Sequence, residues 1–83
     1  MRDEVQTLER FPVDGKRYDL IPGRWFKVKG RRGDFKVVRL DLFSDGTVEA
    51  LCWWKSGAKG LQAQWVTIGL TGQCVAEVTR ISK

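Results

Sequence analysis

Hydrophobic and polar residues alternate along most of the chain after residue 24, a two-residue period typical of β-strands that bury one face. Glycine-containing segments interrupt the alternation, and SDG at 44–46 has the composition of a tight hairpin turn with Gly46 at positive φ. The pattern predicts five strands: RWFKVK at 24–29, FKVVRLDLF at 35–43, TVEALCWW at 47–54, LQAQWVTI at 61–68 and CVAEVTRI at 74–81.

The first 21 residues carry a weaker pattern. Val5, Leu8 and Phe11 recur at a roughly helical spacing, which predicts a short helix or a fraying arm. The next residues, FPVDGKRYDLIPG, contain Asp-Gly and Pro-Gly pairs and are typical of an extended lead-in whose apolar side chains dock elsewhere. We therefore expect an N-terminal arm or lead-in over residues 1–21 and a β-domain over residues 22–83.

Five short strands at close, even spacing indicate a small antiparallel all-β barrel or roll. An OB-fold is the competing architecture, and it commonly carries a helix between its third and fourth strands. Only KSGAKG at 55–60 separates those strands here, which leaves no room for that helix. The sequence therefore favours a five-stranded SH3-like barrel preceded by an N-terminal arm or short helix.

Alternation also predicts which side chains of the third strand face the core. Glu49 decides the register, because an unpaired buried carboxylate is energetically expensive. Its face, which includes Trp53, should point outward, and Trp54 on the other face should close one end of the barrel. The inward side chains are then Val48, Ala50 and Cys52.

The same argument applies to the other strands. On the second strand Phe35 is out of phase with the apolar set that follows, so we expect a β-bulge near Lys36-Val37. On the fourth strand Trp65 should lie outside. The inward residues are expected to be Val38, Leu40 and Leu42, then Val66 and Ile68, and then Cys74, Ala76 and Val78, which would make Cys52 and Cys74 reduced neighbours.

The net charge of +5 comes from one segment of the chain. Residues 1–23 carry four basic and five acidic groups, and residues 40–83 carry four of each. Residues 24–39 carry seven basic groups against Asp34 alone, a net charge of +6. Such concentration indicates a polyanionic partner, usually nucleic acid and less often a membrane surface, or a basic hairpin that serves only solubility.

Several function classes lack the residues they need. The chain has no histidine, so Ser-His-Asp and Cys-His catalysis and imidazole metal ligands are excluded, and the carboxylates have no catalytic spacing. GRRGDF and KSGAKG lack the Walker Lys-Ser/Thr and a following helix. We expect no enzymatic activity, cofactor or metal. Without an apolar leader or an apolar span, we expect a cytoplasmic protein with no membrane partner.

IPGRWFKVKGRRGDFKVVRL, followed by an Asp-Gly hairpin and GAKG, resembles a group of small proteins encoded by actinobacterial phages. The resemblance covers residues 20–81 and implies an SH3-like or Tudor-like barrel and a phage or prophage setting, with the host cytoplasm as the location of a phage-encoded chain, without an activity. The chain departs from the pattern at Trp54-Lys55-Ser56, where the group favours Gly-Gly-Pro. The matching residues are Pro22, Gly23, Phe26, Val28, Gly30, Arg32, Gly33, Phe35, Val38, Arg39, Gly57, Gly60, Arg80 and Ile81.

Two functions remain. The first is nucleic-acid binding of low sequence specificity, in which basic side chains neutralise phosphates and aromatic rings stack on bases; its candidate residues are Trp25, Lys27, Lys29, Arg31, Arg32, Lys36 and Arg39. The second is a protein-interaction module that binds a host or phage protein, or a second copy of itself, through an aromatic groove; its candidate residues are Trp53, Lys55, Lys59 and Trp65. Trp25 has a simpler interpretation, in which the N-terminal arm covers it.

Overall fold

A computed structural model describes residues 5–13, 15–55, 57, 60–70 and 73–81, without the side chains of Gln73, Cys74 and Arg80. The regular structure is all β. The strands are β1 (Val5–Leu8), β2 (Phe11–Val13), β3 (Tyr18–Leu20), β4 (Trp25–Val28), β5 (Asp34–Phe43), β6 (Val48–Lys55), β7 (Leu61–Leu70), β8 (Gln73–Cys74) and β9 (Val78–Ile81). The described part of the chain holds no helix long and apolar enough to cross a membrane.

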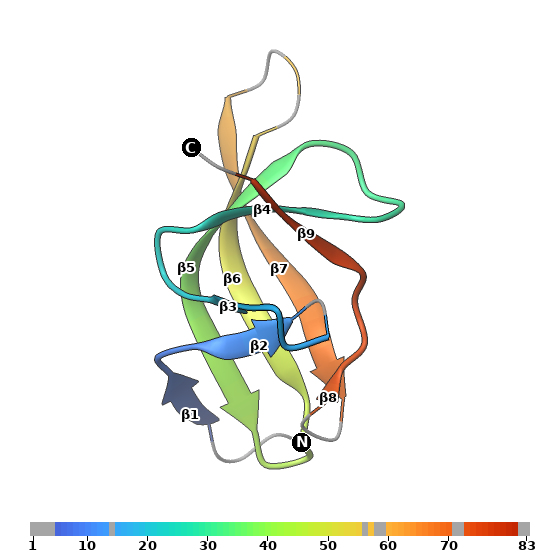
Figure 1. Ribbon diagram of the computed structural model, residues 1–83. Coiled ribbons are helices and arrows are strands. Elements are labelled where there is room, and N and C mark those ends of the chain that lie inside the picture. Colours follow the sequence, from blue (N-terminus) through green and yellow to red (C-terminus); the bar gives the residue numbers. More distant parts are fainter. Residues whose placement is uncertain (1–4, 14, 56, 58–59, 71–72, 82–83) are drawn as a thin grey trace.

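The long strands β5, β6 and β7 form the centre of a seven-stranded antiparallel sheet with the order β8-β7-β6-β5-β4-β9. β1 adds to this sheet by pairing with β5, and β2 and β3 form a separate two-stranded sheet. This β2–β3 hairpin lies across one side of the three long strands, and β4 and β9 run together across their upper end (Figure 1).

The expected five-stranded closed barrel is wrong in two respects. The described residues form more than five strands, and the sheet is open, with β8 at one edge and β9 at the other. The segment predicted as a single fifth strand splits into these two edges. β8 pairs with β7 while β9 pairs with β4, so residues 75–77 carry the chain from one edge of the sheet to the other.

β5 makes two different contacts along one edge. Its first residues pair with β4, and its last residues pair with β1. Between these regions the register toward β6 shifts between Val37 and Arg39, which makes Val38 the extra residue of a β-bulge. The expected bulge is therefore present, slightly later than predicted. Val38 is 42% exposed, so its predicted inward orientation is wrong.

The N-terminal segment is neither a helix nor a loose arm where it is described. Phe11 and Val13 of β2 and Leu20 of β3 are buried in the same cluster as the sheet residues. Pairing explains the strand conformation, because β1 completes the edge of β5 that β4 leaves open, and β2 alternates buried, exposed and buried positions. The core therefore extends across the expected boundary between residues 21 and 22.

The inward face of β6 is confirmed, since Val48, Ala50 and Cys52 are almost completely buried. Trp54 closes one end of the core as predicted, and it stacks on the Phe35 ring at a centroid distance of 6.4 Å. Phe35 in turn stacks on Phe26 at 5.5 Å. These three rings occupy directly opposed positions on β4, β5 and β6, so they form one aromatic ladder beneath the sheet.

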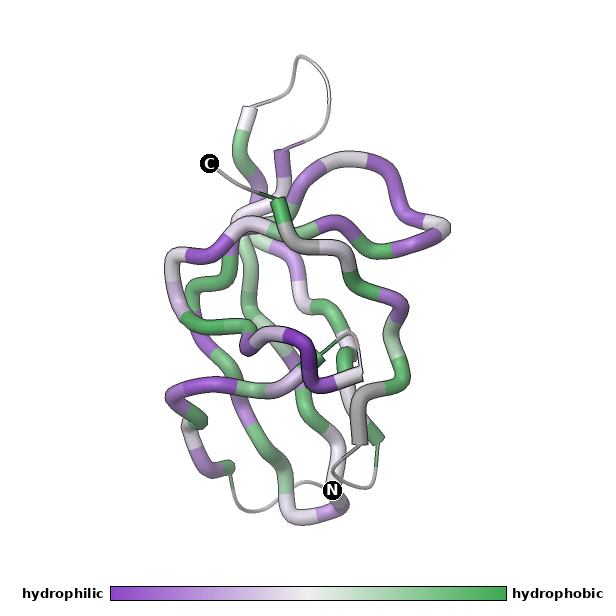
Figure 2. The backbone as a smooth tube through the Cα atoms, in the orientation of Figure 1, coloured by the Kyte–Doolittle hydropathy of each residue, from purple (hydrophilic) through white to green (hydrophobic). Residues whose placement is uncertain are grey.

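The remaining register predictions agree with the structure at several positions. Leu40, Val66, Ile68 and Val78 are buried, and Trp65 is exposed. The predicted SDG turn is confirmed, with Gly46 at φ 87°. Cys74 falls outside the described side chains, and so does its expected contact with Cys52. In Figure 2 the loop between β4 and β5 is hydrophilic over most of its length, as its basic sequence requires.

Candidate functional site

The sheet has a second surface, turned away from the β2–β3 hairpin and the core. We call it the outer face, meaning the side chains of β4, β5, β6 and β7 at the positions that alternate with the buried ones. Trp53 and Trp65 lie on it and are each 44% exposed. The β2–β3 hairpin packs into the core on the other side of the sheet.

One row of directly opposed residues crosses the outer face. Trp25 of β4 lies opposite Lys36 of β5, and Lys36 lies opposite Trp53 of β6. Trp53 lies opposite Ala63 of β7. Side chains at opposed positions are about 4.5–5.5 Å apart at Cβ, so Lys36 starts between two tryptophans. Trp25 is half-buried. Its exposure therefore lies between the two sequence interpretations, a ring open to a ligand and a ring covered by the N-terminal arm.

A neighbouring row brings an arginine onto the third tryptophan. Arg39 of β5 lies opposite Leu51 of β6, which lies opposite Trp65 of β7. The Arg39 guanidinium carbon lies 5.5 Å from the centroid of the Trp65 ring, which is a cation–π contact. Arg39 and Trp65 therefore form one cation–π unit on a row that spans three strands.

Asp41 fixes the direction of Arg39. Its two carboxylate oxygens accept hydrogen bonds from Arg39 Nε at 3.0 and 3.3 Å. Asp41 is only 3% exposed, whereas the Arg39 side chain is 48% exposed. A half-exposed guanidinium is thus held by a buried carboxylate, which restricts its rotamers before any ligand arrives.

The third row, at the end of the face, is more strongly charged. Lys55 of β6 lies between Asp34 of β5 and Leu61 of β7. Lys27 Nζ forms an ion pair with Asp34 Oδ1 at 2.7 Å, although the Lys27 side chain is still 58% exposed. Two lysines therefore border the tryptophan row, with one carboxylate between them.

The basic side chains of the loop between β4 and β5 contact other parts of the protein and do not lie on the outer face. Lys29 Nζ lies 3.1 Å from Glu77 Oε2, and the Arg31 guanidinium carbon lies 5.1 Å from the Phe35 ring centroid. Arg32 accepts a hydrogen bond of 2.7 Å at its carbonyl oxygen from Trp54 Nε1. These contacts tie the loop to the inner aromatic ladder and to the segment before β9. Its basic side chains therefore contribute to packing at the end of the core.

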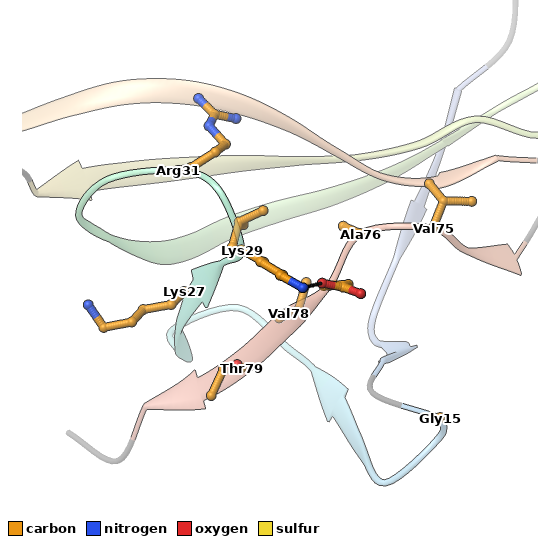
Figure 3. A pocket seen from close by; sticks show the side chains of 10 residues that line it. Gly15, Lys27, Lys29, Arg31, Val75, Ala76, Val78 and Thr79 are labelled. Atoms are coloured by element: carbon orange, nitrogen blue, oxygen red, sulfur yellow. Dashed lines mark ion pairs between the residues drawn. The ribbon is translucent and has the colours of Figure 1, made fainter.

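A hollow of about 660 Å³ lies beside this loop, between β4 and residues 75–79. Lys27, Lys29 and Arg31 line it, together with apolar residues such as Val75 and Val78. Figure 3 shows the three cationic side chains pointing in different directions, with Lys29 turned toward Glu77. Because the charged ends diverge, the hollow offers no convergent site for one anion.

The structure thus brings together residues from both predicted sets. Lys29, Arg31 and Arg32 lie apart from the outer face in the loop, and Lys59 lies outside the described residues. The predicted site residues that share the outer face are Trp25, Lys27, Lys36, Arg39, Trp53, Lys55 and Trp65. Nucleic-acid and protein-interaction candidates that looked separate in the sequence therefore form one surface.

Some residues of this surface were not predicted as site residues. Leu61 is 52% exposed and Val38 42% exposed, and Ala63 leaves space on one side of Trp53. Because Val66 was predicted to face inward, alternation along the strand would have placed Leu61 and Ala63 on the same face as Trp65. The contact of Asp41 with Arg39 had no comparable signal, since Arg-Leu-Asp is an ordinary strand sequence.

The buried Cys52 thiol is held in its unreactive, protonated form. Burial raises the pKa of the Cys52 thiol to about 12, against a smaller lowering by the Arg31 guanidinium, so the thiol is protonated at neutral pH. Among the described residues, no three Cys, Asp or Glu side chains are gathered as ligands for a metal ion. The arrangement can supply stacking surfaces, cations and apolar area.

Comparison of the chain with protein-family models, curated proteins and solved structures gave no match.

Proposed function

We propose that the chain is a binding module that holds nucleic acid on its outer face with low sequence specificity. The observation that supports this most strongly is the row Trp25, Lys36, Trp53, in which a lysine lies between two tryptophans. Aromatic rings can stack on any base, and neighbouring cations neutralise phosphates, so such a surface binds without reading sequence.

The charge balance of the face is consistent with this proposal. Lys27, Lys36, Arg39 and Lys55 provide four cations. Three carboxylates, Asp34, Asp41 and Glu49, share the face with them, and Asp34 and Asp41 are paired with two of the cations, at 2.7 and 3.0 Å. A face with so few cations should bind only moderately, and non-specific binders have a Kd of about 10⁻⁴–10⁻⁶ M at physiological salt.

A salt titration of oligonucleotide affinity, followed by tryptophan fluorescence, tests the proposal. For single strands the slope of log K against log salt is about −0.7 for each phosphate neutralised, so three or four contacts give about −2 to −3. Lys36→Glu should weaken binding strongly and reduce the slope by about 0.7. Arg17→Glu, an equal charge change at an exposed residue of the β2–β3 turn, is the matched control and should have a smaller effect.

Absence of binding at low salt, or equal losses from Lys36→Glu and Arg17→Glu, contradicts the proposal. Equal losses would show that affinity follows net charge alone and that the outer face has no special part in it.

A protein partner is the second candidate for this face. The observation that favours it is the apolar area around Trp53 and Trp65, where Leu61 and Val38 are also exposed. Exposed apolar patches of this kind commonly mark protein interfaces. In the setting that the sequence resemblance implies, the partner is a host or phage protein or a second copy of the chain. Sedimentation analysis over a concentration range, with Trp53→Ala as the comparison, tests self-association.

A further inference from the structure

We infer that the ligand of the outer face is single-stranded, with unpaired bases stacked on Trp53 and on the Arg39–Trp65 unit. This inference rests on the proposed nucleic-acid function and names the ligand class of that site. It follows from the free base faces that two separate rings require, the width of the face and the orientation of Arg39.

The two platforms each need a base whose face is free. Trp53 lies opposite Ala63, and Trp65 is two residues further along β7, so the two tryptophans are diagonal neighbours. Diagonal positions on a sheet are about 7–8 Å apart. In a duplex both faces of a base are covered by the base pairs stacked about 3.4 Å above and below it. Bases can therefore lie on both rings only if they are unpaired, because a paired base would first have to leave the duplex stack.

The width of the face gives an independent reason. The outer face extends over β4, β5, β6 and β7. Three strand spacings of about 4.8 Å make it about 14 Å wide between the outermost backbones. The major groove is about 12 Å wide and accommodates a helix or a two-stranded ribbon. A four-stranded face is too wide to enter it, and its tryptophans could reach only the outside of a duplex, where the base faces are covered.

Arg39 supplies a stacking layer as well as a charge. Its guanidinium lies on one side of the Trp65 ring at 5.5 Å, and Asp41 holds Nε at 3.0 Å. Guanidinium planes stack on unpaired bases much as aromatic rings do. A base placed on Arg39 therefore extends the existing Arg39–Trp65 layer, and Arg39 can still donate from its terminal nitrogens to a phosphate.

Lys36 and Lys55 then lie beside the stacked bases. Lys36 adjoins Trp53 on β5, and Lys55 follows Trp53 by two residues on the same face of β6. Phosphates that flank a base on Trp53 are within reach of these two long side chains. The strand is thus expected to cross the sheet diagonally, from Trp65 past Trp53 toward the Lys55 end.

Three probes of equal length distinguish this inference from binding by charge alone. They are oligodeoxythymidine, its duplex with oligodeoxyadenosine, and an abasic oligomer with the same number of phosphates. We expect oligodeoxythymidine to bind most tightly and to quench tryptophan fluorescence. The abasic oligomer should bind about 5- to 140-fold more weakly for each base stack that is lost.

Variants locate the stacking on the outer face. Trp53→Ala and Trp65→Ala should each weaken oligodeoxythymidine binding about 5- to 140-fold and leave abasic binding nearly unchanged. Lys36→Glu should weaken binding of both probes by the same factor. Trp53→Phe, which keeps an aromatic ring at an exposed position, should give an intermediate loss and guards against a result caused by misfolding.

The outcomes separate the two proposals. If none of the three probes binds at low salt, the nucleic-acid function itself fails. If the abasic oligomer or the duplex binds as tightly as oligodeoxythymidine, the single-strand inference is overturned while low-specificity nucleic-acid binding stands. If Trp53→Ala weakens binding of the thymidine and abasic probes equally, the ring has a structural role and the stacking inference is also overturned.

Discussion

Trp53 and Trp54 are adjacent in the chain and lie on opposite faces of β6. The Trp53 ring is 44% exposed on the outer face. The Trp54 ring stacks on Phe35, and its Nε1 donates a hydrogen bond of 2.7 Å to the Arg32 carbonyl oxygen. Consecutive strand residues point to opposite sides, so one side chain of this pair stabilises the core and the other is available to a ligand.

This division predicts different consequences for the two tryptophans. Trp54→Ala should lower the free energy of unfolding by about 3 kcal/mol, because it removes a ring from the aromatic ladder and a hydrogen bond to the loop. Trp53→Ala should lower it by less than about 1 kcal/mol, as expected for a surface position. Urea denaturation of both variants measures the difference. A larger loss for Trp53→Ala would place Trp53 in the core.

The β-bulge in β5 makes a second prediction. Val37 is 1% exposed and Val38 is 42% exposed, although they are neighbours of the same type. Val37→Lys should destabilise the protein by more than about 3 kcal/mol, because it buries an unpaired charge. Val38→Lys should change stability by no more than about 0.5 kcal/mol. Similar thermal midpoints for the two lysine variants would show that Val38 is not the extra residue.

The Arg39–Asp41 pair should respond asymmetrically to substitution. Arg39→Met leaves the nearly buried Asp41 carboxylate without its Arg39 donor, and it should cost about 1–3 kcal/mol. Asp41→Asn leaves a guanidinium that water can reach, and it should cost less. In a double-mutant cycle the combined variant should therefore be more stable than Arg39→Met alone. A greater loss from Asp41→Asn than from Arg39→Met would contradict this assignment.

Burial of the Cys52 thiol leads us to expect that the stability of the protein falls at alkaline pH. Its pKa is raised to about 12 in the folded chain, mainly by burial. In the unfolded chain the thiol ionises near its ordinary pKa of about 8.5. Below that pH both states are protonated and the group has no effect. Between about pH 9 and 12 only the unfolded state loses the proton, so stability falls by on the order of 1 kcal/mol per pH unit.

Cys52→Ala isolates this contribution from other groups that titrate in the same range. The variant is less stable at neutral pH because a buried atom is lost, but its stability should fall less steeply above pH 9. Parallel curves for the wild type and the variant would show that the thiol ionises equally in both states. Alkylation by iodoacetamide at pH 8 should likewise be slow in the folded protein and fast in urea.

Local pattern was enough to locate β4, β5, β6 and β7, because each alternates over most of its length and ends at a glycine-containing turn. It was not enough for β1, whose pairing partner lies more than thirty residues further along the chain. β1 is exposed at three of its four positions, so no buried face gives it an alternating pattern. A local pattern also does not show which edge of a sheet a strand joins, so it could not divide the last predicted strand between two edges.

The candidate site divides in a similar way. Its cations and aromatic rings were visible in the sequence as residue types, and the outward orientation of Trp53 and Trp65 followed from alternation. Their grouping was not visible, because Lys36 of the basic segment meets Trp53 only through the β5–β6 register. Lys29 belongs to the same basic segment as Lys36, yet it lies in the loop and pairs with Glu77.

The sequence by itself determined the all-β class, the positions of the long strands and the opposite orientations of Trp53 and Trp54. These features depend on the two-residue period and on turn residues, which act locally. Only the tertiary structure decided that the sheet stays open, that the N-terminal hairpin supplies part of the core, and that Trp25, Lys36 and Trp53 form one row. Those features depend on which strands pair, and pairing is a property of the whole fold.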